Sequence, residues 1–211
     1  TGSDAKKLFA KSIVAPFKRL PKFFRPEYDK SQGITPKSEL RFQQTNVKGR
    51  KAEEVLLKGE LNSMIDFQSS EAVSYDGSKL HRYVADECGK TIEINVYDRH
   101  QVVMYCVLND EGKVIGKMLY TTTVEEMESG GEAFKLLWDD SDQTKKGDSK
   151  RTPSGLYRFF MPAYRTRNFD KYGYPDEEKT LNDIQEERKI LANSPRALSA
   201  RIRKEPLTIQ E

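Results

Sequence analysis

The sequence predicts an α+β protein with a small antiparallel meander sheet (about five strands), one packing helix, an extended basic N-terminal arm and short C-terminal helices. Three observations support this prediction. Apolar residues recur with a period of two in the middle of the chain and with a helical period on either side of it. Short glycine-containing links separate the period-two segments, which favours hairpins. Hydrophobic residues make up 36% and charged residues 33% of the 211 positions, so a compact middle with poorly buried ends is expected.

Five segments predict the strands. In TIEINVY (91–97) apolar and polar residues alternate, as they do in a half-exposed strand. QVVMYCVL (101–108) is apolar on both faces and predicts a central strand. The turn NDEGK, with Gly112, predicts a hairpin into the next strand. The remaining strands are expected at 114–123, 133–138 and 155–160.

Helices are expected at both ends of the chain and on the sheet. The first 14 residues predict a short helix, and 48–67 predicts the helix that packs on the sheet. Pro16, Pro21 and Pro26 then oppose regular structure and favour an extended arm. Near the C-terminus, Thr180 and Asp183 are spaced as in a capping box, and Ser194-Pro195 is typical of an N-cap followed by the first helical residue. We therefore expect an arm at 1–47, a core at 48–160 and an extension at 161–211.

The charge is unevenly distributed although its total is only +3. Residues 1–26 hold seven Lys or Arg against one acid, and 149–174 hold six against one. Residues 121–148 hold eight acids against three lysines. Such segregation indicates faces that meet different partners, or each other.

Few residues suit metal or thiol chemistry. The two histidines and two cysteines (His81, Cys88, His100 and Cys106) have no paired-ligand spacing, so no metal site is predicted. Cys106 is expected to be buried in its strand. Cys88, in the polar sequence VADECGKT, is expected in an exposed turn, as a free thiol that could react with an oxidant or carry a covalent chromophore; no other cofactor is predicted. Asp139-Asp140-Ser141-Asp142 is interpreted as a solvated acidic loop.

The sequence KRTPSGLYRF contains Thr152, Pro153, Gly155 and Tyr157, and with the preceding segment from residue 92 it resembles the first half of an L,D-transpeptidase domain. That resemblance implies a later histidine-glycine segment and a nucleophilic cysteine. The chain has no histidine after His100 and no cysteine after Cys106. An incomplete or degenerate domain of that family therefore stays only an alternative, and we predict no catalytic residue.

Arginine and aromatic side chains alternate in two segments of the chain. They suit single-stranded RNA, and they are also enriched at the energetic centres of protein interfaces. Since 33 acids nearly balance 36 basic residues, protein docking is favoured over RNA. The predicted partner-binding residues are Phe17, Arg19, Phe23, Phe24, Arg25, Tyr157, Arg158, Tyr164, Arg165 and Arg167.

The functional hypothesis is a non-enzymatic linker or scaffold subunit whose arms dock onto acidic proteins of a large assembly. A photosynthetic antenna complex is one such host, and an RNA-binding subunit of a ribonucleoprotein is the alternative. No apolar run approaches the about 20 residues that cross a bilayer, so no membrane span is expected. Sparse cysteines favour a reducing intracellular compartment, either the cytoplasm or an organelle interior reached after removal of a targeting peptide.

Overall fold

A computed structural model describes residues 2–29, 35–42, 63–68, 74–90, 94–123 and 131–210. The chain divides into two compact units, residues 1–75 and 76–211. Helices and strands are mixed, which confirms the α+β class. The five-stranded antiparallel meander is wrong, because the described residues form two separate two-stranded sheets.

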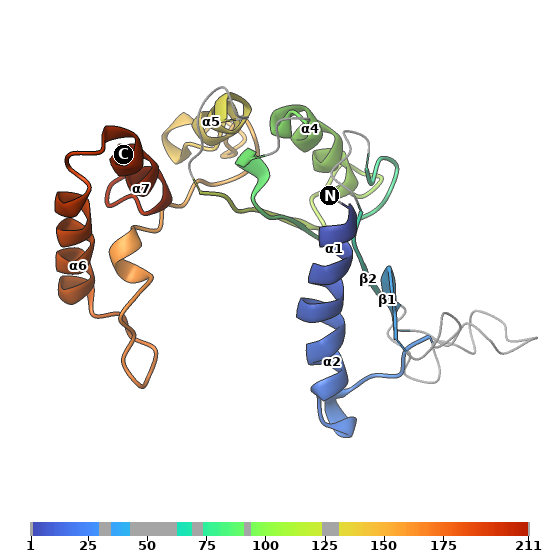
Figure 1. Ribbon diagram of the computed structural model, residues 1–211. Helices are drawn as coiled ribbons and strands as arrows, with labels where there is room; N and C mark the ends of the chain where they lie inside the picture. Colours follow the sequence, from blue (N-terminus) through green and yellow to red (C-terminus); the bar gives the residue numbers. More distant parts are fainter. Residues whose placement is uncertain are drawn as a thin grey trace, which may run out of the picture. The chain divides into compact units, whose positions relative to one another are not determined.

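The first unit begins with a nearly continuous helical rod (Figure 1), made of α1 (Gly2–Phe9), the π-helix η1 (Ala10–Val14) and α2 (Ala15–Arg19). The helix predicted at 1–14 is therefore confirmed. The extended arm predicted after it is wrong at 15–19, because Pro16 lies in the first turn of α2, where proline is tolerated. A 3-10 turn, η2 (Lys22–Phe24), follows.

A small apolar core holds the first unit together. Phe9, Val14 and Phe17 from the rod pack with Leu40 of β1 (Glu39–Arg41). β1 pairs antiparallel with β2 (Met64–Asp66), with Leu40 opposite Ile65. The helix predicted at 48–67 is therefore wrong at its end, where β2 lies, and its 48–62 portion lies outside the described residues.

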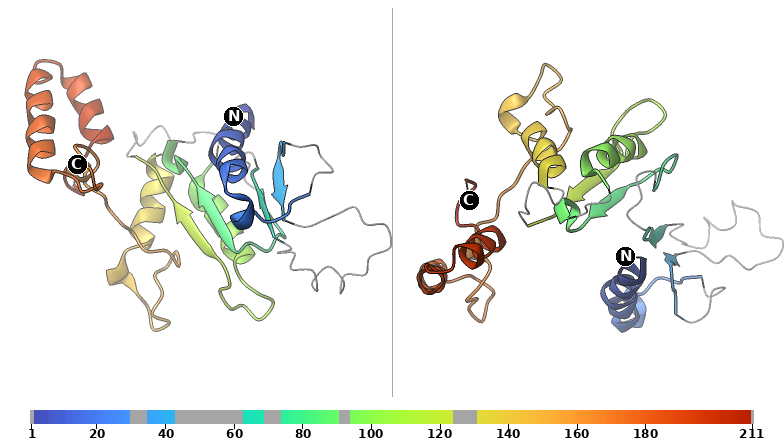
Figure 2. Two further views of the ribbon diagram at one scale, coloured as in Figure 1. Left: turned by 90° about the horizontal axis from the view of Figure 1, so that it is seen from below. Right: turned by 45° about the horizontal axis from the view of Figure 1, so that its top comes forward.

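The second unit opens with a strand–helix–strand arrangement. β3 (Arg82–Ala85) is followed by η3 (Cys88–Lys90), α4 (Val96–Cys106) and β4 (Lys117–Tyr120). β3 and β4 lie side by side and run parallel (Figure 2), in a register that places Arg82 opposite Lys117 and Ala85 opposite Tyr120. A parallel pair needs a long crossover, and α4 lies within it.

Three of the predicted strands are corrected by this arrangement. The segment 101–108 lies mostly in α4, because Asn95 caps a helix by accepting from the backbone N–H groups of Tyr97 and Asp98. The predicted strand 91–97 enters α4 at Val96, and its residues 91–93 lie outside the described residues. The predicted strand 133–138 lies in α5 (Gly131–Asp140). Only 117–120 of the predicted strand 114–123 is paired, as β4. The turn at Gly112 is confirmed by its N–H bond to the carbonyl of Asn109 and its φ of 74°.

Short 3-10 turns and two helices complete the second unit: η5 (Gln143–Lys145), η6 (Ala163–Arg165), α6 (Glu177–Ile190) and α7 (Pro195–Lys204). α6 and α7 lie next to each other (Figure 1). The prediction of a capping box at Thr180 and Asp183 is wrong. Asp176 is the N-cap of α6, and Thr180 lies one turn into the helix, where it is buried. The predicted helix start at Ser194-Pro195 is confirmed, although the Ser194 side chain makes no capping hydrogen bond.

None of the helices in the described ranges has the length and hydrophobicity of a membrane-spanning segment.

Candidate docking surface

The Thr-Pro-Ser-Gly sequence forms a buried anchor. The side chains of Thr152 and Ser154 are almost fully buried. Thr152 Oγ1 donates to the carbonyl of Leu156 at 2.5 Å, and Ser154 Oγ lies 2.8 Å from Ser141 Oγ. Gly155 has a φ of 73°, a conformation that favours glycine, and its N–H donates to the carbonyl of Thr152 at 3.0 Å.

His100 ties this anchor to α4. Its Nε2 lies 2.8 Å from the carbonyl oxygen of Ser154 and its Nδ1 3.0 Å from the hydroxyl of Tyr120. A carbonyl only accepts, so Nε2 carries the proton, and in the neutral ring Nδ1 accepts from Tyr120. Burial lowers the pKa of His100, which favours this neutral form. This contact could not be predicted from the sequence, because Tyr120 and Ser154 lie 20 and 54 residues after His100.

The segment after the anchor presents aromatic rings to solvent. Tyr157 and Phe159 are exposed, Phe159 to 76%, and Lys146 Nζ lies 4.8 Å from the centre of the Tyr157 ring. The strand predicted at 155–160 is wrong as a paired strand: within the described residues the segment joins neither sheet.

A tight hairpin at 169–175 presents two further rings. Phe169 and Pro175 form an antiparallel bridge, and Asp170 Oδ1 accepts from the backbone N–H groups of Tyr172 and Tyr174. Gly173 takes a φ of 87° at its turn. Tyr172 and Tyr174 are 73% and 72% exposed. Their backbone is held by the hydrogen bonds to Asp170, so the hairpin presents both rings from a fixed turn.

The predicted arginines at 158, 165 and 167, in contrast, form ion pairs with acidic residues of the same chain. Arg158 pairs with Asp142 at 2.7 Å and lies over the ring of Trp138, and Arg165 pairs with Glu177 at 2.9 Å. Backbone and side-chain hydrogen bonds from Thr144, followed by the charge of Arg158, lower the pKa of Asp142. Tyr164 is half-buried, with the Arg165 guanidinium 5.9 Å from its ring centre.

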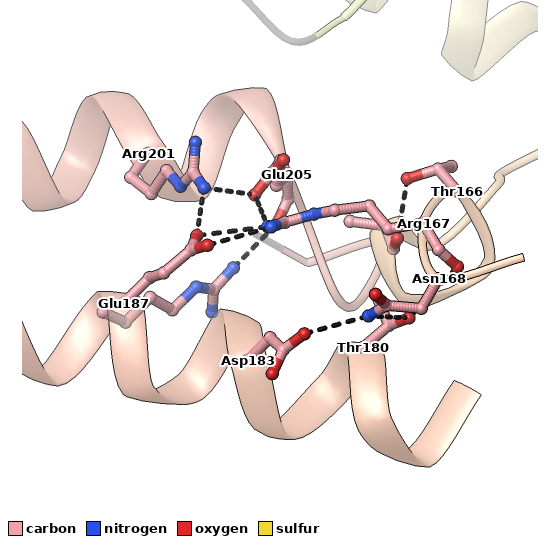
Figure 3. A network of polar contacts seen from close by, with 10 residues as sticks. Thr166, Arg167, Asn168, Thr180, Asp183, Glu187, Arg201 and Glu205 are labelled. Atoms are coloured by element: carbon pink, nitrogen blue, oxygen red, sulfur yellow. Dashed lines mark hydrogen bonds and ion pairs between the residues drawn. The ribbon is translucent and has the colours of Figure 1, made fainter. Parts of the chain in front are cut away.

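Arg167 is the centre of a network between the hairpin and the last two helices (Figure 3). It donates to Glu187 on α6 at 2.9 and 3.1 Å and to Glu205 at 2.5 Å. Arg201 on α7 contacts the same two carboxylates. Hydrogen bonds from Arg167 and then Arg201 lower the pKa of Glu187 to about 2. Asn168, in turn, donates to Thr180 and Asp183 on α6.

Of the partner-binding residues predicted near the N-terminus, some are exposed and others make contacts within the chain. Phe17 is buried, and its ring packs edge-on against Tyr28 and Phe42, so it is part of the core of the first unit. Phe23 and Phe24 are exposed neighbours with ring centres 4.1 Å apart. Arg25 donates to the carbonyl of Lys18, while Arg19 is exposed at the end of α2.

The expectation of an exposed Cys88 is wrong. Its side chain is 8% exposed and packs with Val96 and Leu137, because η3 turns it inward. Burial raises the pKa of its thiol to about 11. Cys106 is buried as predicted, on α4 rather than on a strand, and burial raises its pKa too. Within the described residues, no group of three His, Cys, Asp or Glu side chains is placed to hold a metal ion.

No known protein family, curated protein or solved structure matches this chain.

Proposed function

We propose that the chain is a non-enzymatic linker or scaffold subunit. It docks onto acidic partner proteins of a large assembly through exposed aromatic side chains at 157–174 and at Phe23-Phe24. The observation that carries this proposal is the outward placement of the rings on supports fixed by internal hydrogen bonds and ion pairs.

Fixed supports favour docking energetically. Ordering a flexible arm costs about 1–2 kcal/mol per residue of backbone, and this cost opposes binding. The hairpin at 169–175 is already held by Asp170 and by the contacts of Asn168 with α6. Its tyrosines have two side-chain torsions each and can bury a large area at little further entropic cost.

The charge available to an acidic partner comes mainly from lysines. Arg158, Arg165 and Arg167 are occupied by carboxylates of this chain. Lys146 and Lys171 instead lie over exposed tyrosine rings, 4.8 and 4.9 Å from the ring centres of Tyr157 and Tyr172. The arginines therefore position the surface, and the rings with their lysines contact the partner.

Single-stranded RNA is the second candidate partner. Rings that alternate with cations offer stacking and phosphate contacts, as the Lys171–Tyr172 pair does. Protein remains the first choice because 33 acids nearly balance 36 basic residues, whereas a dedicated nucleic-acid binder usually has a larger positive excess.

The test is capture of partners by the tagged full chain from cells that contain it. We expect changing both Tyr172 and Tyr174 to alanine to reduce the captured protein by at least about tenfold, a loss typical of interface hot spots. Tyr105→Ala is the matched control, because Tyr105 is an exposed tyrosine on α4 of the same unit. Capture that is unchanged in the double variant would contradict docking by the hairpin.

Two further measurements on the captured sample distinguish a protein assembly, a ribonucleoprotein and an antenna complex. Ribonuclease treatment that releases the partners would replace the protein proposal by the RNA alternative. Visible absorbance together with the mass of the chain tests the antenna host and the chromophore on Cys88.

A further inference from the structure

We propose that the backbone edge of residues 157–161 accepts an extended segment of an acidic partner protein as an added β-strand. This inference rests on the proposed docking function and names the way in which the partner binds.

The chain from Leu156 to Pro162 contains no helix, turn or bend, and the exposure of its side chains alternates. Its last residue, Pro162, has extended dihedral angles, with φ −67° and ψ 144°. Tyr157, Phe159 and Met161 are exposed, whereas the residues between them are half-buried. A period of two is the pattern of a strand that lies with one face on the protein.

One edge of this segment is occupied at Arg158. The backbone N–H of Arg158 donates to the carbonyl of Ser141 at 3.1 Å, and Gln143 Nε2 donates to the carbonyl of Arg158 at 3.0 Å. In an extended chain, the N–H and C=O of one residue point to one edge and those of the next residue to the other. Tyr157, Phe159 and Met161 therefore direct their backbone groups to the opposite edge.

That opposite edge is open within the described part of the chain. There, the backbone N–H and C=O groups of Tyr157, Phe159 and Met161 make no hydrogen bond to other described residues. Proteins usually protect such an edge with proline, charge or a covering element. Here two aromatic side chains and a methionine accompany it, a composition that favours strand pairing.

Both ends of the edge are fixed before any partner arrives. Leu156 N–H donates to Ser154 Oγ at 3.1 Å, and its carbonyl accepts from Thr152. At the far end, Ala163 N–H donates to the carbonyl of Pro206 at 2.9 Å. A strand held in this way is ready for β-augmentation, in which main-chain bonds supply affinity and side chains supply specificity.

The charges beside the edge select an acidic occupant. Lys146 lies over the ring of Tyr157, and the turn that follows is closed by Gly147 N–H donating to the carbonyl of Arg151. That turn carries Lys150 and Arg151, both exposed, against Asp148 alone. Asp142 on the other side is paired with Arg158. The net charge at the start of the edge is therefore positive, and it complements carboxylates on an added strand.

The test uses the full chain and a fluorescent peptide, Glu-Val-Glu-Val-Glu-Val-Glu, with binding followed by fluorescence anisotropy. Saturating peptide should slow hydrogen exchange at the amides of Tyr157, Phe159 and Met161. Phe159→Pro removes one donor from the edge and should weaken binding by about 3–10-fold. Phe159→Leu keeps the donor and is the matched control, which should weaken binding less.

Two peptide controls keep the test independent of any misfolded variant. A peptide in which lysine replaces glutamate should bind at least about tenfold more weakly, because its charges repel the turn. A peptide N-methylated at alternate residues cannot pair with the edge on its methylated side and should bind more weakly for one of the two methylation registers. Equal binding by all of these peptides, or amides that gain no protection, would overturn the inference. So would an RNA oligonucleotide that binds where the acidic peptide does not.

Failure of this inference can be distinguished from failure of the proposed scaffold function. Changing Tyr172 and Tyr174 to alanine should leave peptide binding unchanged, because the hairpin is not part of the edge. Capture of partner proteins without protection of the edge amides would remove this inference alone. Protection of the edge by peptide, with no protein captured from cells, would remove the scaffold function alone.

Discussion

The imidazole of His100 donates a hydrogen bond to the backbone carbonyl of Ser154, 54 residues later, at 2.8 Å. Its second nitrogen is occupied by the hydroxyl of Tyr120 at 3.0 Å. One buried ring therefore joins α4, β4 and the anchor from which the edge at 157–161 begins.

The stability of the second unit should fall as the pH drops below about 6.5. Burial lowers the pKa of His100 from its ordinary 6.5, so the unfolded chain binds its proton more readily than the folded chain. The contribution of His100 is complete above the unfolded pKa and is lost as the pH falls through the folded pKa. Urea unfolding followed between pH 8 and pH 5 should show a falling midpoint.

His100→Gln is the variant that tests this assignment. It should lower the midpoint at pH 8, because a glutamine cannot reproduce both contacts, and should flatten the dependence between pH 8 and pH 5. His81→Gln, at an exposed position, should leave both quantities unchanged. A pH dependence that persists in His100→Gln would contradict the prediction.

Gly116→Ala should destabilise the second unit by about 1–3 kcal/mol. A Cβ at this position would lie 2.1 Å from the carbonyl oxygen of Leu80 and 2.9 Å from the side chain of Val107. The backbone must shift to relieve the first contact, which also disturbs the join between α4 and β4. Gly147→Ala is the control, since a Cβ there meets nothing within 4 Å. Equal urea midpoints for the two variants would disprove the close approach at Gly116.

The sequence predicted the type and position of elements best where the signal was local. Ser194-Pro195 marked the start of α7, and Gly112 marked its turn, because each acts through the dihedral angles of its own residues. The interpretation of the apolar run 101–108 as a strand is wrong, because residues 101–106 lie in α4. A short run that is apolar on both faces fits a buried helix equally well, and the deciding signal was the cap at Asn95.

The candidate site was predictable in composition but not in geometry. The sequence predicts the aromatic residues of 157–174 as a group, and the structure places Tyr157 at the surface. The sequence also predicts that the arginines beside them face a partner. Their pairing with Asp142, Glu177 and Glu187 could not be inferred, because it depends on where distant segments meet. The parallel pairing of β3 with β4 has the same non-local origin.

Neither cysteine should react with a thiol reagent at pH 8 while the chain is folded. Burial shields both thiols and raises their pKa, that of Cys88 to about 11, so little thiolate forms. Denaturant should release two reactive thiols per chain, which a colorimetric disulfide reagent counts. Fast labelling of one thiol in the native chain, mapped to Cys88 by mass spectrometry, would restore the exposed-turn prediction.

The pairing of α6 with α7 should weaken in acid. Hydrogen bonds from Arg167 and Arg201 lower the pKa of Glu187 from 4.5 to about 2. The stability that this group contributes is therefore complete above pH 4.5 and is lost as the pH falls from 4.5 toward 2. Circular dichroism should show helix loss over this range, and Glu187→Gln should show part of that loss already at pH 7. Glu186→Gln is the matched control, because Glu186 forms only an exposed pair with Lys189 that contributes little. If both variants titrate like the unchanged chain, the network around Arg167 does not hold the two helices together.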